Sequence, residues 1–77
     1  INMRELTLQF KKIEEQIPDF DEEVIVFYYD TEQDKRFPKM SIGYLSSINR
    51  EGYNFYLSEG VRTTNVLSWA EKPDYNG

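Results

Sequence analysis

The sequence predicts a small, mainly β fold: an antiparallel sheet or partly open barrel of four to five strands. Three observations predict it. Branched and aromatic residues gather in short runs, a polar turn ending in glycine separates two of these runs, and aromatic residues make up 16% of the chain. With 77 residues, the chain has room for one domain, residues 1–77, whose ends at 1–4 and 74–77 we expect to be flexible.

The first long strand is predicted between Glu23 and Asp30. Apolar side chains fall on both of its faces, which is typical of a central strand covered on both sides. The charged stretch from Thr31 to Lys39 follows, and its Phe37-Pro38 pair predicts a loop, because proline cannot donate to a sheet ladder. The side chains on the two faces are Val24, Val26 and Tyr28, and Ile25, Phe27 and Tyr29.

A hairpin is the strongest local signal of the chain. Between Met40 and Ile48, alternation places Met40, Ile42 and Tyr44 on one side of a strand. The turn Asn49-Arg50-Glu51-Gly52 follows, with glycine where a left-handed residue would close it, and the run from 53 to 57 alternates again.

A last strand is predicted from Val66 to Ala70, which is short, apolar and β-prone, and which ends before Pro73. A polar connection from Glu59 to Asn65 precedes it. If this strand lies exposed at an edge, it can pair with a second copy of the chain, so the sequence leaves the oligomeric state open.

Two interpretations compete for the N-terminal segment. Apolar residues spaced four, three and four apart from Leu6 to Ile17 fit one face of a helix. That interpretation gives an α+β fold, with a helix over residues 5–16 packed on a four-stranded antiparallel sheet. Leu6, Leu8 and Phe10 also alternate at period two, as in a strand. Local periodicity leaves both open.

Four motifs follow one another between residues 10 and 73. They are Phe10-x-x-Ile13-x-x-x-Ile17-Pro18, a short acidic stretch, Glu23-Val24-Ile25-Val26-Phe27-Tyr28, and Val66-x-x-Trp69 followed by Pro73. In order and spacing they resemble a small domain-of-unknown-function family common in phages and prophages. Its members typically show a tryptophan, a valine, a Leu-Pro pair, an acidic turn, a Val-Leu-Val-Tyr strand and a closing Thr-His-Trp-Met-Pro-Leu-Pro. This chain departs from the pattern at Phe10, where tryptophan is usual, and at Ser68, where histidine is usual.

The resemblance implies a fold and a genomic habitat, and no established activity. In such proteins the stretch from Phe10 to Ile13 looks extended. We therefore favour the β interpretation, with Thr7 to Ile13 as an added strand and Glu14 to Gln16 as at most a helical turn. Phe10, Ile13 and Ile17 are then expected to anchor the core.

The composition argues against an enzyme. The chain has no histidine and no cysteine, so Ser-His-Asp and Cys-His arrangements and the usual zinc sites are excluded. The pairs Glu14-Glu15 and Glu22-Glu23 lie in one exposed acidic turn, whereas acid-base catalysis needs two carboxyl groups in different environments. We expect a non-enzymatic protein without cofactor or metal.

The charge is −5 and unevenly distributed: residues 1–34 carry ten acidic and three basic residues, and residues 35–77 carry four and six. This chain lacks the basic surface that nucleic-acid phosphates require, which argues against such a partner. The longest apolar run, Val24 to Tyr29, is far shorter than the roughly 18 residues of a membrane span, and no signal-peptide pattern is present. We expect a soluble, cytoplasmic protein with no membrane contact.

The first functional hypothesis is a protein-protein interaction domain with an unknown protein partner. Its surface would use aromatic residues of the kind that anchor interfaces, with Tyr29 and Tyr56 as the exposed candidates. Trp69 is a further candidate, although Trp69, Tyr44 and Phe55 fit the core of a small domain better than an interface.

The second hypothesis uses the acidic segment from Glu14 to Glu23, which holds six acids and no bases. Glu14, Glu15, Glu22 and Glu23 would imitate nucleic-acid phosphates and block a host protein that handles DNA or RNA. The simpler interpretation, which we favour, is a charged turn that keeps the protein soluble. A third hypothesis is a platform of stacked aromatic residues that binds single-stranded nucleic acid.

Overall fold

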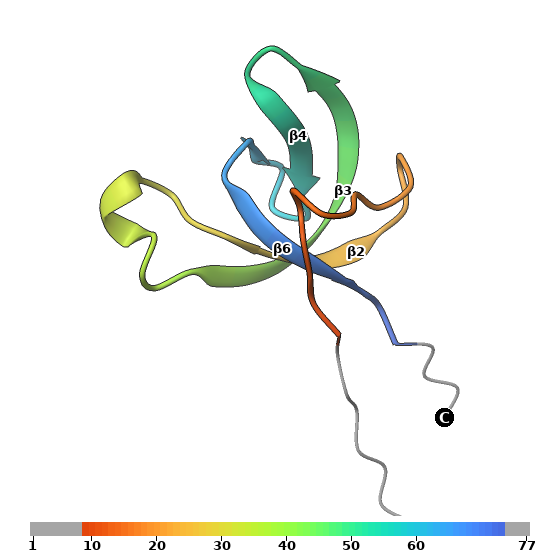
Figure 1. The fold of residues 1–77 in the computed structure, drawn as a ribbon, viewed down its shortest axis with the longest axis horizontal. Coiled ribbons are helices and arrows are strands. Elements are labelled where there is room, and N and C mark those ends of the chain that lie inside the picture. The colour runs from red at the N-terminus through yellow and green to blue at the C-terminus, as the bar shows by residue number, and fades with distance from the viewer. Residues whose placement is uncertain (1–8, 74–77) are drawn as a thin grey trace, which may run out of the picture.

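The computed structural model describes residues 9–73, so the predicted flexible ends at 1–4 and 74–77 lie outside the described residues. Six strands form one antiparallel sheet in the order β1-β6-β2-β3-β4-β5 (Figure 1). The mainly β prediction is confirmed, with one strand more than the upper bound expected. The strands are β1 (Lys11–Lys12), β2 (Val24–Tyr28), β3 (Lys39–Asn49), β4 (Gly52–Leu57), β5 (Arg62–Thr63) and β6 (Val66–Glu71).

The N-terminal strand is shorter than predicted. β1 covers only Lys11–Lys12, and Thr7 and Leu8 lie outside the described residues. The chain then turns, since the amides of Glu15 and Gln16 both donate to the Lys12 carbonyl, at 3.0 and 3.1 Å. The alternative helix over residues 5–16 is wrong for its described part, residues 9–16, because the backbone there pairs with β6 before it turns.

β2 is central, as predicted, and lies between β6 and β3. Its two faces differ: Val24, Val26 and Tyr28 are buried, whereas Ile25 and Phe27 are half-buried. Branched and aromatic side chains favour the extended backbone here, and their alternation places the buried set on the core side of the sheet. The predicted cover on both sides is therefore complete on the core face and partial on the other face.

β3 is long and pairs with two neighbouring strands. Gly43 takes part in both pairings, since it lies opposite Val24 on β2 and opposite Leu57 on β4. A Cβ atom at this glycine would come within 2.6 Å of the Tyr56 carbonyl oxygen. The close approach of β3 and β4 therefore requires a residue without a side chain at this position.

The predicted hairpin is present between β3 and β4, with Asn49 opposite Gly52. Gly52 has a φ of 128°, a conformation that glycine adopts readily. The Asn49 side chain accepts a hydrogen bond of 2.8 Å from the Glu51 amide, so the turn residues stabilise their own turn.

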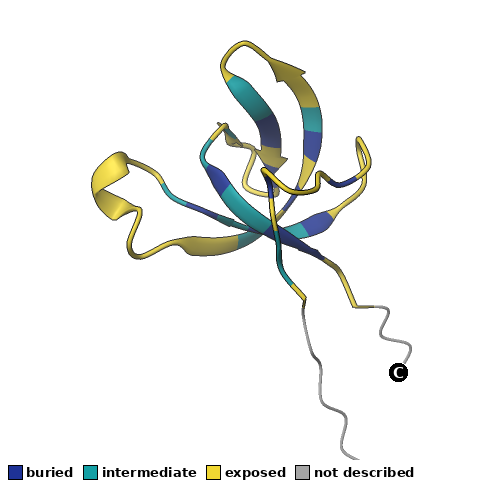
Figure 2. Ribbon diagram, in the orientation of Figure 1, coloured by how far each residue is buried: buried dark blue, intermediate teal, exposed yellow. Residues whose placement is uncertain are grey.

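The buried residues of the sheet lie along β2, β3, β4 and β6, whereas the loop between β2 and β3 is exposed (Figure 2). The prediction that Ile13 anchors the core is confirmed. The same prediction for Ile17 is wrong, because 37% of this residue is exposed. The chain leaves the turn after β1 with Pro18 pointing inward in place of Ile17. Phe10 is half-buried. The buried cluster is Ile13, Val24, Val26, Tyr28, Leu45, Phe55, Leu57, Val66 and Trp69.

β6 is not an edge strand, because it pairs with β1 on one side and with β2 on the other. The pairing with a second copy that an exposed Val66–Ala70 edge would offer is therefore excluded. The short strands β1 and β5 form the edges instead. Among the described residues, no helix is long and apolar enough to cross a membrane.

Candidate functional site

The side of the sheet opposite the core carries apolar side chains that are exposed or half-buried in the described chain. Six of these residues, named at the end of this paragraph, form what we call the outer face. Cross-strand pairs place them side by side: Ile25 lies opposite Ile42, Phe27 opposite Met40, and Tyr44 opposite Tyr56. Directly opposed residues share a face of a sheet, so the outer face is continuous over three strands. Its members are Ile25, Phe27, Met40, Ile42, Tyr44 and Tyr56.

Aromatic contacts hold the outer face in place. The rings of Tyr44 and Tyr56 stack with centroids 5.9 Å apart, and those of Phe10 and Phe27 stack at 4.5 Å. Both separations suit offset stacking, which restricts ring motion before any partner binds. Met40 remains 59% exposed and Tyr56 39% exposed. Large apolar side chains are therefore presented to solvent on a rigid sheet.

Two cations border the outer face at opposite edges of the sheet. Lys12 lies opposite Ser68, which itself lies opposite Phe27, so Lys12 is in the same row. Arg62 lies opposite Tyr56, and its Nη1 donates to the Asn54 side-chain oxygen at 3.4 Å. Neither cation forms a salt bridge with another described residue. The outer face thus has a cation without a salt bridge at each of these two edges, in a chain whose net charge is −5.

The acidic segment, residues 14–23, connects β1 to β2 and is bonded to two strands on its way. The indole nitrogen of Trp69 donates to the Gln16 carbonyl at 2.8 Å, and the Asp21 amide donates to the Leu45 carbonyl at 2.9 Å. These two bonds fix the segment to β6 and to β3. Asp21 has a φ of 66°, which redirects the chain toward β2.

The structure places the four predicted carboxylates in two groups. Glu14 and Glu15 lie in the turn after β1, and Glu22 and Glu23 lie just before β2, and all four are exposed. Glu23 forms a salt bridge of 2.8 Å with Lys72, whereas no other acid of the segment forms one within residues 9–73.

The three predicted aromatic site residues lie in different environments. Tyr56 belongs to the outer face. Tyr29 is half-buried at the end of β2, and its hydroxyl donates to a Glu32 carboxylate oxygen at 3.3 Å. Trp69 is only 3% exposed, so its ring packs in the core and offers no surface to a partner. Of the other core candidates, Phe55 is fully buried, whereas Tyr44 is 36% exposed and the prediction for it is wrong.

Sequence reasoning missed four members of the outer face: Ile25, Phe27, Met40 and Ile42. Alternation in the sequence does place Met40, Ile42 and Tyr44 on one side of a strand, which β3 confirms. The missing signal is which side faces the core. The small residues Ser41 and Gly43 alternate with them, and the larger side chains lie on the solvent side because the core side has no room for them at Gly43.

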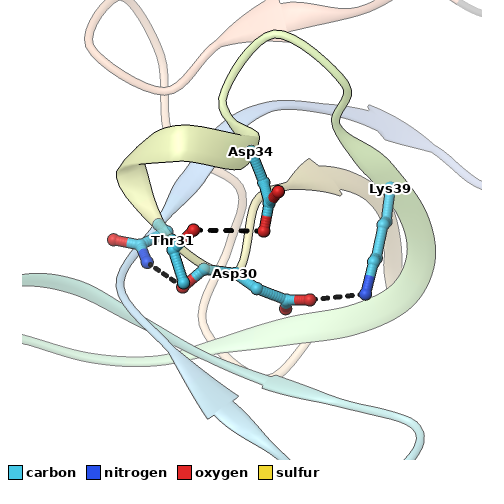
Figure 3. Close-up of polar contacts among 5 residues, drawn as sticks. Asp30, Thr31, Asp34 and Lys39 are labelled. Carbon is cyan, nitrogen blue, oxygen red and sulfur yellow. Dashed lines mark hydrogen bonds and ion pairs between the residues drawn. The ribbon is translucent and has the colours of Figure 1, made fainter.

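The loop between β2 and β3, residues 29–38, is called the arm, and a cluster of polar side chains lies at its base (Figure 3). The Thr31 hydroxyl donates to an Asp34 carboxylate oxygen at 3.1 Å, where a 3-10 turn (Glu32–Asp34) begins. Lys39 donates to a carboxylate oxygen of Asp30, and the Asn65 side chain donates to the Asp30 carbonyl at 3.5 Å. These contacts tie the base of the arm to the start of β6.

The hydrogen bond that Lys39 donates to the Asp30 carboxylate, followed by the negative charge of that carboxylate, raises the pKa of Lys39 above the ordinary value of 10.5. Because the pKa of Lys39 is higher in the folded state than in the unfolded state, this contact stabilises the folded protein at pH values below the unfolded pKa. The stabilisation is lost as the pH rises through the folded pKa. We expect Asp30→Ala to return the Lys39 pKa toward 10.5, as measured by NMR titration of the side-chain methylene. Asp34→Ala is the control, since Asp34 is the weakest of the causes that raise this pKa. An unchanged titration in Asp30→Ala would contradict the contact.

Comparisons of the chain with protein-family models, with curated proteins and with solved structures find no match. The resemblance to a phage and prophage family therefore stays a prediction. In the part of the chain that the structure describes, no three His, Cys, Asp or Glu side chains gather as a metal site would require. The class that the fold and the surface define is a small antiparallel β domain that exposes an apolar sheet face and an acidic segment.

Proposed function

We propose that this protein is a non-enzymatic interaction domain that binds a protein partner through its outer face. The observation that carries the proposal is the continuous apolar surface over β2, β3 and β4, with the stacked Tyr44 and Tyr56 at its end. Exposed contiguous apolar surface of this kind is typical of interaction sites, and tyrosine is enriched at the residues that dominate binding energy.

The geometry favours a protein over a nucleic acid as the partner. Aromatic side chains on a sheet can stack on bases, but such sites also track the backbone with a basic groove. Here the cations Lys12 and Arg62 border the outer face from different edge strands, β1 and β5. The single-strand hypothesis stays a prediction. A role as an accessory protein of a phage, a prophage or their bacterial host, in the cytoplasm, is part of the proposal and has its support in the sequence resemblance.

We expect Tyr56→Ala to weaken capture of the partner while the fold is kept. Tyr56 is 39% exposed, so its removal costs the folded state little, whereas an interface tyrosine contributes about 2 kcal/mol, or roughly thirtyfold in affinity. The measurement is affinity capture from a bacterial lysate with the partner identified by mass spectrometry, followed by titration of the purified partner. Circular dichroism confirms that the variant is folded.

Phe37→Ala is the matched control, because Phe37 is 75% exposed and lies on the arm outside the outer face. It should bind as the unchanged protein does. Equal binding by Tyr56→Ala and the unchanged protein would overturn the proposal.

A second candidate function is the acidic mimic of nucleic-acid phosphates. It is favoured by one observation: within residues 9–73, the acids of the segment other than Glu23 form no salt bridge. In the same capture experiment, the mimic predicts a different result from binding through the outer face. A partner that survives Tyr56→Ala and is lost when Glu14, Glu15, Glu22 and Glu23 are changed to glutamine would support the mimic.

A further inference from the structure

We propose that the outer face of one copy of this protein binds the acidic segment of a second copy, so that chains associate head to tail. This inference rests on the proposed function, because it names a partner for the same outer face. It is carried by the match between two surfaces of the described chain: an apolar face with a cationic border, and an acidic segment that itself exposes apolar side chains.

The charges of the two surfaces are complementary. The outer face is bordered by Lys12 and Arg62, and neither forms a salt bridge with another described residue. The acidic segment holds six carboxylates and no base. Opposite charges across a contact steer association and fix its register more than they add affinity. The segment therefore meets the border of the outer face in one favoured orientation.

The acidic segment also presents apolar side chains. Ile17 and Phe20 are 37% and 52% exposed, and both lie between carboxylates. Their backbone is fixed, because Gln16 is bonded to Trp69, and Phe20 forms a bridge to Leu45. A segment held in place before binding loses less conformational entropy on association. Ile17 and Phe20 are thus ready-made anchors for an apolar face.

The two surfaces use different side chains. Gln16 lies over the core side, where Trp69 is buried, and Phe20 pairs with the backbone of Leu45 beside β3, whereas the outer face carries the side chains that point away from the core. One copy can therefore use both surfaces at once. Such a heterologous contact gives a ring if its rotation closes and an open chain if it does not.

A two-fold contact between outer faces fits the charges less well. It would bring together two copies of the same border, so the cations Lys12 and Arg62 of one copy would face the same two cations of the other. The head-to-tail contact gives both cations acidic neighbours. It also covers the exposed Phe20, which a contact between outer faces leaves in solvent.

The test blocks one surface at a time. Tyr56→Asp places a charge on the outer face, and Phe20→Asp removes the apolar anchor of the acidic segment. Both positions are exposed, and circular dichroism checks that both variants fold. Sedimentation velocity is run on each protein alone and on an equimolar mixture, up to on the order of 1 mM, where even a contact of about 4 kcal/mol is populated.

For head-to-tail association, we expect the mass of the unchanged protein to rise with concentration, while each variant alone stays a monomer. The mixture should form a heterodimer and nothing larger, because each variant keeps only one surface. Arg62→Glu and Glu22→Lys repeat the experiment by charge reversal at two exposed positions.

Two outcomes overturn the inference. An unchanged protein that stays a monomer at every concentration has no such contact. If Phe20→Asp still associates by itself, the outer faces pair with each other instead. A monomeric protein that nevertheless loses a captured partner on Tyr56→Ala would leave the proposed function standing, so the two failures are distinguishable.

Discussion

Replacing Trp69 by alanine should lower the free energy of unfolding by about 3–5 kcal/mol, as for other large aromatic side chains removed from a core. Trp69 is 3% exposed and lies in the buried cluster between β1 and β2. A domain of 77 residues has a total stability of roughly 4–12 kcal/mol. The expected loss is about half of the middle of this range, so the variant should unfold at a much lower urea concentration than the unchanged protein.

Trp69→Phe separates the ring from its hydrogen bond. Phenylalanine keeps most of the buried area but loses the indole N–H that donates to the Gln16 carbonyl at 2.8 Å. We expect a loss of about 1–2 kcal/mol, because Gln16 is exposed and water can replace the donor. Urea unfolding is followed by circular dichroism, since Trp69 is the one tryptophan of the chain. Equal losses in both variants would contradict the packing described for the ring.

Gly43→Ala should destabilise the protein by about 2 kcal/mol, although glycine-to-alanine changes in extended backbone usually stabilise. The new Cβ atom would lie 2.6 Å from the Tyr56 carbonyl oxygen. This oxygen belongs to the backbone of β4, so it cannot move aside as a flexible side chain would. β3 must then separate from β4 at the point where it also pairs with Val24 of β2.

The measurement for Gly43→Ala is the midpoint of urea unfolding at constant slope. Ser47→Ala on the same strand is the control. Ser47 is exposed, and the Asn54 side chain contacts only its carbonyl oxygen, so the change should stay within about 0.5 kcal/mol. A Gly43→Ala variant as stable as this control would show that β3 and β4 lie further apart than described.

The parts of the fold that the sequence predicts are those fixed by local chemistry. The hairpin follows from Gly52, which supplies the positive φ, and from Asn49, whose side chain bonds the turn. The strand after Glu23 follows from its branched residues. Both signals act over a few neighbouring residues, so no knowledge of the tertiary contacts is needed to recognise them.

The errors concern which face or edge each strand uses. Ile17 has the spacing of a core residue, yet Pro18 occupies the inward position after the turn. Tyr44 alternates as expected but on the solvent side, and β6 is central because β1 covers its outer edge. All three depend on contacts between segments far apart in the sequence, which periodicity does not report.

The candidate site was predicted unevenly for the same reason. The acidic segment is visible as a run of charge, and the exposure of Glu14, Glu15, Glu22 and Glu23 follows from it. The outer face is assembled from three strands, and nothing in one strand alone indicates that its neighbours also expose apolar side chains. Tyr56 could be proposed singly, but its five companions could not be recognised as one surface.

The central position of β6 has a consequence for how the chain reaches its native state. β1 finds its partner only after β6 is available, and the bond between Trp69 and Gln16 joins residues 53 positions apart. Contacts of such long sequence separation slow folding, because the chain between the two residues loses entropy before the contact stabilises the fold. The β3–β4 hairpin can form early, and β2 can pair with β3. The other edge of β2 then stays unpaired until β6 forms. Until β6 arrives, that edge is the place where a nascent chain is most exposed to aggregation.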